Sequence, residues 1–183
     1  MTNLFQKTSS LLFNDPLRMA CLRAAREVAL PNWYIGAGFL RNAIWDHLHQ
    51  KQEMTPLNDV DLVYFDPQSV SSQRELEMAH QLSTVCPDVA WEVKNQARMH
   101  IRHGHSPYRN TSDGISRWVE VPTCVGVRLT EEDDFVFTAP LGLEENWSLV
   151  VRINPDYSQP ELYRQRIKEK DWQQIWPELN CNS

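Results

Sequence analysis

Apolar residues alternate between two spacings along the N-terminal half of this chain, and each spacing predicts a different element. Apolar side chains every three or four positions are typical of helices, and short continuous apolar runs are typical of strands. Pro16 and the glycines at 36 and 38 mark the boundaries. The predicted elements are, in chain order, a helix over 17–30, a strand over 33–35, a helix over 39–50, a strand over 60–65 and a helix over 70–85.

The second half begins with strict alternation of apolar and polar residues over 89–101, which predicts one long strand with a buried face and a polar face. The segment 103–117 contains glycine, proline, asparagine and serine, and we expect a long loop there that acts as a lid. The remaining predicted elements are strands over 123–129 and 135–138, a short helix after Pro140 and a helix within 159–176. The mixture of strands and helices predicts an α/β (α+β) fold.

Composition adds limits to this pattern. A chain of 183 residues with 42% hydrophobic residues and seven tryptophans is long enough for one good core. We therefore expect a single domain over 1–183, with a core at about 17–102 and a C-terminal β/α portion at about 118–178. The net charge of −6 argues against a general nucleic-acid coat. The four cysteines form no C-x-x-C pair, so reduced structural thiols are expected.

Neither a signal peptide nor a membrane span is predicted. The first residues, 1–13, have no basic region followed by a sustained apolar run, and no window reaches membrane-spanning length. We expect a cytoplasmic protein without a membrane partner.

Two aspartates one residue apart carry the strongest chemical signal. In a strand, residues i and i+2 point to the same face, so Asp59 and Asp61 present their carboxylates together while Val60 and Leu62 enter the core. Carboxylate oxygens are the ligands that hard divalent cations prefer. The pattern predicts a metal-binding strand end.

A basic segment follows. No acidic residue lies between 93 and 112, which holds Lys94, Arg98, Arg102 and Arg109 together with three histidines, His100, His103 and His105. In a protein of net negative charge, this segment predicts a cleft that attracts phosphate. The expected strand places Lys94 and Arg98 on the same face as Glu92. Ion pairing with nearby acids is the alternative for these side chains, and a zinc site at the histidines has no supporting cysteine.

These residues resemble a known superfamily. A small-residue turn after a strand, an arginine early in the next helix and an Asp-x-Asp strand are similar to the DNA polymerase β nucleotidyltransferases. The string Gly38-Phe39-Leu40-Arg41-Asn42 is similar to the Gly-x-Val-Arg-Asp of CCA-adding enzymes and bacterial poly(A) polymerases. Strings beginning at Ile35, Asn58 and Trp91 resemble a small group of bacterial nucleotidyltransferase family proteins.

The resemblance implies a polymerase β-like fold with a mixed sheet, and a reaction. Asp59, Asp61 and Glu92 would hold Mg²⁺ (or Mn²⁺), and a nucleoside monophosphate would move from an NTP to an acceptor hydroxyl with release of pyrophosphate. Gly36, Gly38, Arg41, Lys94 and Arg98 would bind the nucleotide, with the helix N-terminus facing the triphosphate. The acceptor stays open among an RNA end, a protein and a small molecule.

The sequence departs from the superfamily pattern in two respects, and two other functional classes of protein stay open. Ala37 and Gly38 stand where the superfamily usually has Gly-Gly or Gly-Ser, and the chain lacks room for the RNA-binding body of a CCA-adding enzyme. The first other class is a non-catalytic nucleotide-binding or interaction module with the same fold. The second is a metal-dependent nuclease that uses Asp59 or Asp61 with Glu92 and Lys94.

Overall fold

A mixed sheet lies at the centre of the molecule. The computed structural model describes residues 3–181, and within them a five-stranded sheet has the order β3-β2-β1-β4-β5. Strands β2 and β3 are parallel, and every other neighbouring pair in this sheet is antiparallel. The strands are β1 (Tyr34–Gly36), β2 (Val60–Tyr64), β3 (Trp91–Asn95), β4 (Gly126–Leu129) and β5 (Phe135–Thr138). The predicted mixed α/β fold is confirmed.

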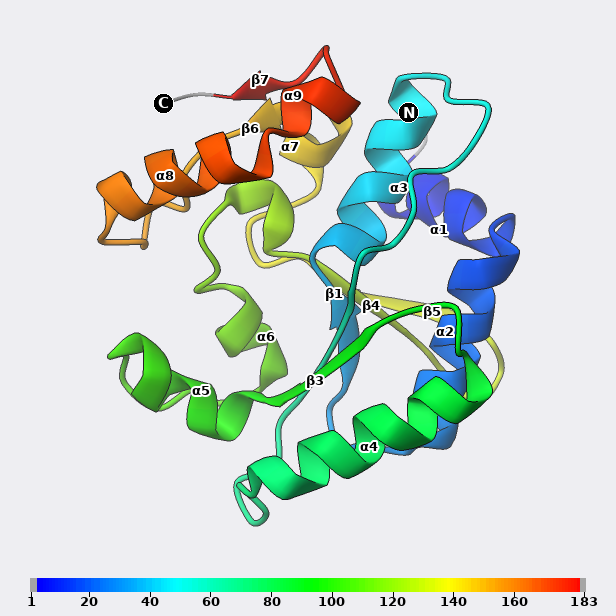
Figure 1. Ribbon diagram of the computed structural model, residues 1–183, viewed down its shortest axis with the longest axis vertical. Helices are drawn as coiled ribbons and strands as arrows, with labels where there is room; N and C mark the ends of the chain where they lie inside the picture. The colour runs from blue at the N-terminus through cyan, green and yellow to red at the C-terminus, as the bar shows by residue number, and fades with distance from the viewer. Residues whose placement is uncertain (1–2, 182–183) are drawn as a thin grey trace.

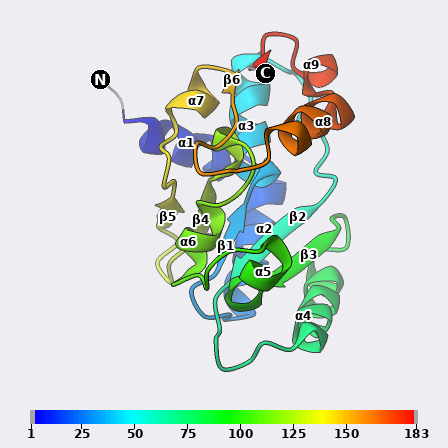
Figure 2. The ribbon, with the colours of Figure 1, turned by 90° about the vertical axis from the view of Figure 1, so that its left-hand side faces the viewer.

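Helices cover both faces and one end of the sheet. Figure 1 shows α2 to the right of the sheet, α5 and α6 to its left, and α8 and α9 above it, and Figure 2 shows α5 and α6 in front of the sheet with α2 behind. The helices are α1 (Leu4–Phe13), α2 (Pro16–Glu27), α3 (Gly38–Leu48), α4 (Ser72–Val85), α5 (Gln96–His103), α6 (Thr111–Ile115), α7 (Glu144–Trp147), α8 (Pro160–Lys170) and α9 (Trp172–Ile175), with a 3₁₀ turn at Val121–Thr123.

The main core lies on one face of the sheet. Val60, Leu62 and Tyr64 of β2 are fully buried in it, together with Val93 of β3. Because side chains alternate along a strand, Asp61 and Val63 of β2 point to the opposite face. A smaller cluster there joins Val63 to Tyr34, Ile115 and Cys124. The sequence prediction that Val60 and Leu62 enter the core is confirmed.

The C-terminal part of the chain packs on α3. Two short parallel strands, β6 (Val150–Val151) and β7 (Asn180–Cys181), accompany α8 and α9. Trp172 and Trp176 of this part meet Trp45 of α3 edge-on, with ring centroids 5.5 and 5.1 Å apart. Asp46 on α3 accepts a 2.7 Å hydrogen bond from the Trp176 indole N–H. These contacts hold α9 against α3, and the Trp172 ring centroid also lies 4.4 Å from Arg41 Cζ in the first turn of α3.

The long strand predicted over 89–101 is wrong beyond Asn95. The backbone turns there into α5, because the Asn95 side chain caps the new helix by accepting a hydrogen bond from the Ala97 N–H. Gly104 ends the helix in a left-handed conformation. Asn95 and Gly104 are residue types that commonly cap helices, but the uninterrupted alternation over 89–101 favours a strand when the sequence is considered alone. Ile101, predicted on the buried face, is 75% exposed.

Other differences are smaller. The predicted loop over 103–117 contains α6, and the C-terminal helix is divided at Asp171 into α8 and α9. Helix α1 and strands β6 and β7 had not been predicted. All four cysteines are free thiols, and burial raises the pKa of Cys21 and of Cys124 to about 12. No described helix is long and apolar enough to cross a membrane.

Candidate active site

Three carboxylates lie near one another on the sheet face opposite the main core. Asp61 of β2 and Glu92 of β3 are register partners across the parallel pair, and Asp59 precedes β2 on the same face as Asp61. In the described part of the chain, none of the three accepts a hydrogen bond or forms an ion pair, so their oxygens are available to a ligand. The structure therefore places Asp61 within electrostatic reach of both Asp59 and Glu92.

Burial and like charge act on the middle carboxylate. Desolvation, with the charges of Asp59 and Glu92, raises the pKa of Asp61 to about 6, although Arg41 and Lys170 oppose the shift. A carboxylate held in this way gains from a cation nearby, because a positive charge offsets both the desolvation and the repulsion.

The three carboxylates fit a Mg²⁺ ion whose coordination sphere is completed by substrate. Among residues 3–181, no three acidic, histidine or cysteine side chains already converge to hold a metal ion. Mg²⁺ in phosphoryl-transfer sites is bound by one or two carboxylates together with waters and substrate phosphates, so a closed protein cage is not required. Asp59, Asp61 and Glu92 supply hard oxygen donors of this kind.

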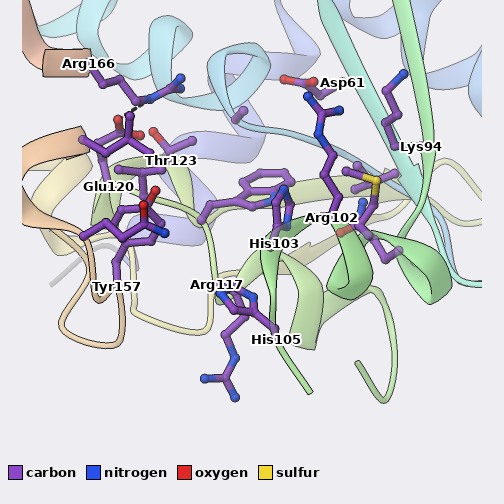
Figure 3. Close-up of a pocket in the computed structure, with 18 of the residues that line it drawn as sticks. Asp61, Lys94, Arg102, His103, His105, Arg117, Glu120, Thr123, Tyr157 and Arg166 are labelled. Atoms are coloured by element: carbon purple, nitrogen blue, oxygen red, sulfur yellow. Dashed lines mark hydrogen bonds and ion pairs between the residues drawn. The ribbon is translucent and has the colours of Figure 1, made fainter. Parts of the chain in front are cut away.

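Two cavities meet at Asp61. The smaller, about 290 Å³, holds Asp59, Gly38, Arg41 and Lys170. The larger, about 550 Å³, holds Glu92 and Lys94, together with side chains of α5 and α8. Figure 3 shows the larger cavity, with Asp61 and Lys94 at one end and Arg166, Glu120 and Thr123 across from them. Ala37, Asp61, Thr123 and Arg166 line both cavities.

The start of α3 faces the smaller cavity. This helix has 11 residues, and no side chain caps its first turn. An uncapped helix start presents free N–H groups and a partial positive charge, which favour an anion. Ala37, at the N-cap, has φ 54° and ψ −125°, a conformation that L residues rarely adopt.

Arg41 is held beside this helix start rather than extended into solvent. Its guanidinium lies 4.9 and 4.4 Å from the ring centroids of Trp45 and Trp172 and donates a 2.9 Å hydrogen bond to the Thr123 hydroxyl. Burial lowers the pKa of Arg41 to about 10, so the group stays charged at neutral pH. Arg41 lines the smaller cavity, so its positive charge is available to a ligand there. Binding of phosphate by Arg41 stays a prediction.

Two predicted nucleotide-binding residues have structural roles that the sequence did not reveal. Gly36 faces Trp118, and a Cβ at this position would lie 2.6 Å from the Trp118 Cη2 atom. Arg98 does not share the face of Glu92, because it belongs to α5 and forms an ion pair with the buried Glu75 of α4. Arg98 lines neither of the two cavities beside Asp61.

Other lining residues come from distant parts of the chain. Arg166 and Lys170 of α8 reach the site because the C-terminal part packs on α3, whereas Thr123 ends the 3₁₀ turn before β4 and accepts a hydrogen bond from Arg41. A lysine or arginine on a charged amphipathic helix gives no local signal that separates a site residue from a solvated one. Sequence reasoning therefore missed these three.

Comparison with known proteins agrees with this geometry. The family model described as nucleotidyltransferase matches residues 23–181. A solved NMR structure described as a CCA-adding enzyme head domain is 33% identical and superposes with a TM-score of 0.86, over 97% of this chain and 95% of that one. The chain belongs to the nucleotidyltransferase family, within the polymerase β-like group, and is a nucleotidyltransferase.

More distant structures share the fold. A CCA-adding enzyme complex with CTP is 15% identical with a TM-score of 0.62, over 96% of this chain and 43% of that chain. A CCA-adding enzyme complex with ATP is also 15% identical, with a TM-score of 0.59, over 95% and 42%. This chain therefore spans less than half the length of those enzymes. A search of curated proteins finds no match.

Proposed function

We propose that this protein transfers a nucleoside monophosphate from an NTP to an acceptor hydroxyl in a metal-dependent reaction that releases pyrophosphate. The observation that carries the proposal is the position of Asp61 and Glu92, register partners at the junction of two cavities. A reaction between two substrates needs the reacting atoms to meet at one point. Two cavities that share Asp61 supply such a meeting point.

The smaller cavity suits the triphosphate. It combines the uncapped start of α3 with the charges of Arg41 and Lys170, and Asp59 and Asp61 lie beside them. Free N–H groups and arginine both favour phosphate oxygens. Two solved structures of CCA-adding enzyme with this fold are complexes with CTP and with ATP, which supports an NTP as the donor here.

Asp59, Asp61 and Glu92 would hold Mg²⁺ or Mn²⁺. When bound, the ion supplies charge neutralisation for the phosphates and lowers the pKa of an attacking hydroxyl. The chain's own residues then orient the substrates: Arg41 is fixed by Trp45, Trp172 and Thr123, so its charge is preorganised toward the smaller cavity.

Calorimetric titration of each NTP, with Mg²⁺ and with EDTA, tests the proposal. The wild-type protein should bind at least one NTP in a metal-dependent manner, and the Asp59→Asn/Asp61→Asn double variant should lose that binding. Asp88→Asn is the matched control, because Asp88 is an exposed carboxylate outside both cavities.

Product analysis with α-³²P-labelled NTP then separates the classes. Label transfer with pyrophosphate release supports the proposal. Phosphodiester cleavage would favour a nuclease that uses Lys94, and NTP binding without either product would favour a non-catalytic module. Wild-type turnover in the double variant would refute the metal assignment.

A further inference from the structure

We propose that the larger cavity is the acceptor site and that the acceptor is a small hydroxyl compound carrying a phosphate group, held by Arg102, His103 and His105. This inference rests on the proposed function, because it names the second substrate of the same site. The three side chains, called the cationic wall below, line the larger cavity together with Asp61 and Glu92.

The distribution of unpaired arginines is the first argument. In the described residues 3–181, Arg41, Arg102 and Arg128 are the arginines without a carboxylate at ion-pair distance. Arg128 lies over the Tyr34 ring, and Arg41 is buried beside the smaller cavity. Arg102 lines the larger cavity without an ion pair, so its guanidinium N–H groups are open to a ligand. In Figure 3 its side chain extends toward the end that holds Asp61.

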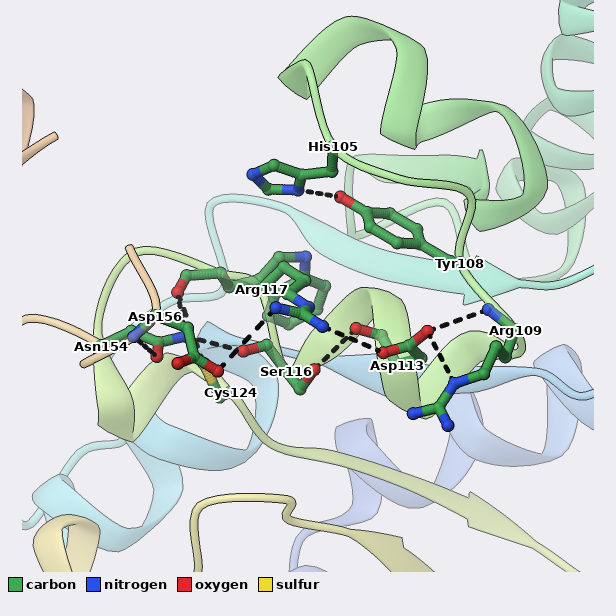
Figure 4. Close-up of polar contacts among 10 residues, drawn as sticks. His105, Tyr108, Arg109, Asp113, Ser116, Arg117, Cys124, Asn154 and Asp156 are labelled. Atoms are coloured by element: carbon green, nitrogen blue, oxygen red, sulfur yellow. Dashed lines mark hydrogen bonds and ion pairs between the residues drawn. The ribbon is translucent and has the colours of Figure 1, made fainter. Parts of the chain in front are cut away.

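Arg117 gives a useful contrast within the same cavity. Its guanidinium lies 3.8 Å from carboxylate oxygens of both Asp113 and Asp156 (Figure 4). Two acidic neighbours offset its charge, so Arg117 has less attraction left for an anionic ligand. The free positive charge of the cavity is therefore concentrated at Arg102 and at Lys94, which also has no ion pair among the described residues.

The two histidines are oriented by one tyrosine. The buried Tyr108 hydroxyl lies 3.2 Å from His103 Nδ1 and 2.7 Å from His105 Nδ1, and Figure 4 shows the second contact. The hydroxyl has one proton, so it donates to one ring and accepts from the other. The ring that accepts carries its proton on Nε2, on the edge away from Tyr108. This N–H is a fixed donor for a ligand oxygen, and it does not require a charged imidazole.

The arginine and the histidine N–H donor of the cationic wall together favour a phosphate group. A guanidinium with a neighbouring N–H donor matches the oxygens of a phosphate monoester, and both bonds are charge-assisted on the ligand side. The wall and the carboxylates lie in one cavity of about 550 Å³, so a phosphate bound at the wall keeps the rest of a small molecule near Asp61. A carboxylate ligand shares part of this chemistry, and the experiment below separates the two.

A nucleic-acid acceptor is less well matched. Binding a nucleic-acid backbone needs several basic side chains free to contact successive phosphates. The exposed arginines outside the cavities, including Arg23, Arg152 and Arg164, are paired with carboxylates, and the net charge is −6. Among the described residues, the basic side chains outside the two cavities that form no ion pair are Lys7, Arg128 and Lys168, which do not make up a continuous basic surface.

The proposed step balances with the two substrates alone. The acceptor oxygen forms a bond to the α-phosphorus of the NTP, and the bond from that phosphorus to the bridging oxygen breaks. Pyrophosphate leaves with the electron pair of the broken bond. The hydroxyl proton passes to a carboxylate of the site and then to water.

The first test measures ligand binding through the NMR signals of His103 and His105. We would record imidazole NMR signals of the wild-type protein during titration with inorganic phosphate, ribose 5-phosphate, ribose, gluconate and a short RNA. Ribose 5-phosphate should shift the His103 and His105 signals, and ribose should not. Arg102→Gln should weaken this binding at least tenfold. Arg164→Gln, an exposed arginine outside both cavities, should leave it unchanged.

Several results would overturn the proposal. They are the absence of a histidine shift with either phosphate, equal shifts with gluconate, tighter binding of RNA at the same histidines, or an unchanged affinity in Arg102→Gln. Loss of NTP binding in Arg102→Gln would also overturn it, because Arg102 would then serve the donor.

The second test is transfer from α-³²P-labelled NTP to matched acceptors with and without phosphate. The phosphorylated acceptor should be preferred at least tenfold, and Arg102→Gln should remove the preference. NTP binding without phosphate binding refutes the acceptor proposal and leaves the transferase. Phosphate binding without NTP binding refutes the transferase, and with it the role of the larger cavity as an acceptor site.

Discussion

Asp61 and Glu92 face each other across the parallel pair of β2 and β3, two strands that are separated in sequence by helix α4. Both side chains point away from the main core because their neighbours Leu62 and Val93 are buried in it. The pairing register therefore sets the distance between the two acids, and a one-residue slip of either strand would move that strand's apolar residues out of the core. Stability of the core and assembly of the site depend on the same register.

Asp61→Asn is expected to stabilise the metal-free protein at pH 8 while abolishing turnover. The pKa of Asp61 is raised to about 6 in the folded state, so the folded protein binds the proton more tightly than the unfolded chain does. Ionisation therefore costs stability, and this cost is fully present above pH 6 and absent below about pH 4. A shift of this size corresponds to about 2 kcal/mol after allowance for partial exposure.

Urea denaturation in EDTA at pH 4 and pH 8 measures this effect. The stability difference between Asp61→Asn and wild type should appear at pH 8 and shrink toward pH 4. Mg²⁺ should then stabilise the wild type and not the variant. A difference that does not change with pH would contradict the electrostatic origin of the shift.

Ala37→Gly is expected to stabilise the protein by about 1 kcal/mol. Ala37 has φ 54° and ψ −125°, which glycine adopts without steric cost, and relief of this strain exceeds the added entropy of the unfolded chain. Thermal denaturation measures the change. Ala43→Gly, in the interior of α3, is the control and should destabilise the protein. A lower melting temperature for Ala37→Gly would show that its methyl contacts outweigh the strain.

Gly36→Ala is expected to destabilise the protein by about 1–3 kcal/mol through overpacking. The added Cβ would meet the Trp118 ring at 2.6 Å and the Val125 carbonyl oxygen at 3.1 Å. Trp118→Leu should partly rescue Gly36→Ala, because it removes the nearer contact. A double-mutant cycle by chemical denaturation gives the coupling energy. Independent effects of the two changes would rule out the contact as the cause.

Arg98→Ala is expected to lower stability by about 3 kcal/mol without changing turnover of the folded enzyme. The change leaves the Glu75 carboxylate buried without its guanidinium partner, which is the costly way to break a buried pair. Denaturation curves and kcat/KM, normalised to folded protein, measure the two quantities. A selective rise in the KM for NTP at unchanged stability would restore Arg98 as a nucleotide-binding residue.

Lys170→Gln is expected to weaken NTP binding about fivefold. Lys170 lines the smaller cavity and adds a positive charge beside Asp61, whereas Lys168 on the same helix lines neither cavity beside Asp61. Lys168→Gln is therefore the matched control and should bind as the wild type does. Calorimetry at two salt concentrations provides the measurement, since a charge effect should shrink at high salt. Equal losses in the two variants would assign the effect to net charge rather than to the cavity.

Local spacing in the sequence is enough to predict the elements around the site. The apolar pattern and the glycine turn gave β1, the start of α3, and β2, because these features depend on spacing within a few residues. Alternation also placed Asp59 and Asp61 on one face opposite Leu62. The family resemblance likewise rests on short strings of sequence, because each string lies within a few neighbouring residues of a strand, a turn or a helix.

The end of β3 and the distant residues that reach the site depend on packing between elements. The alternation over 89–101 does not distinguish a strand from a strand followed by a capped helix, and the Asn95 cap with the Glu75–Arg98 pair settled it. Lys170 joins the smaller cavity because Trp172 and Trp176, which follow it in the chain, pack on Trp45 of α3. Such contacts join residues more than a hundred positions apart, and local periodicity holds no information about packing at that range.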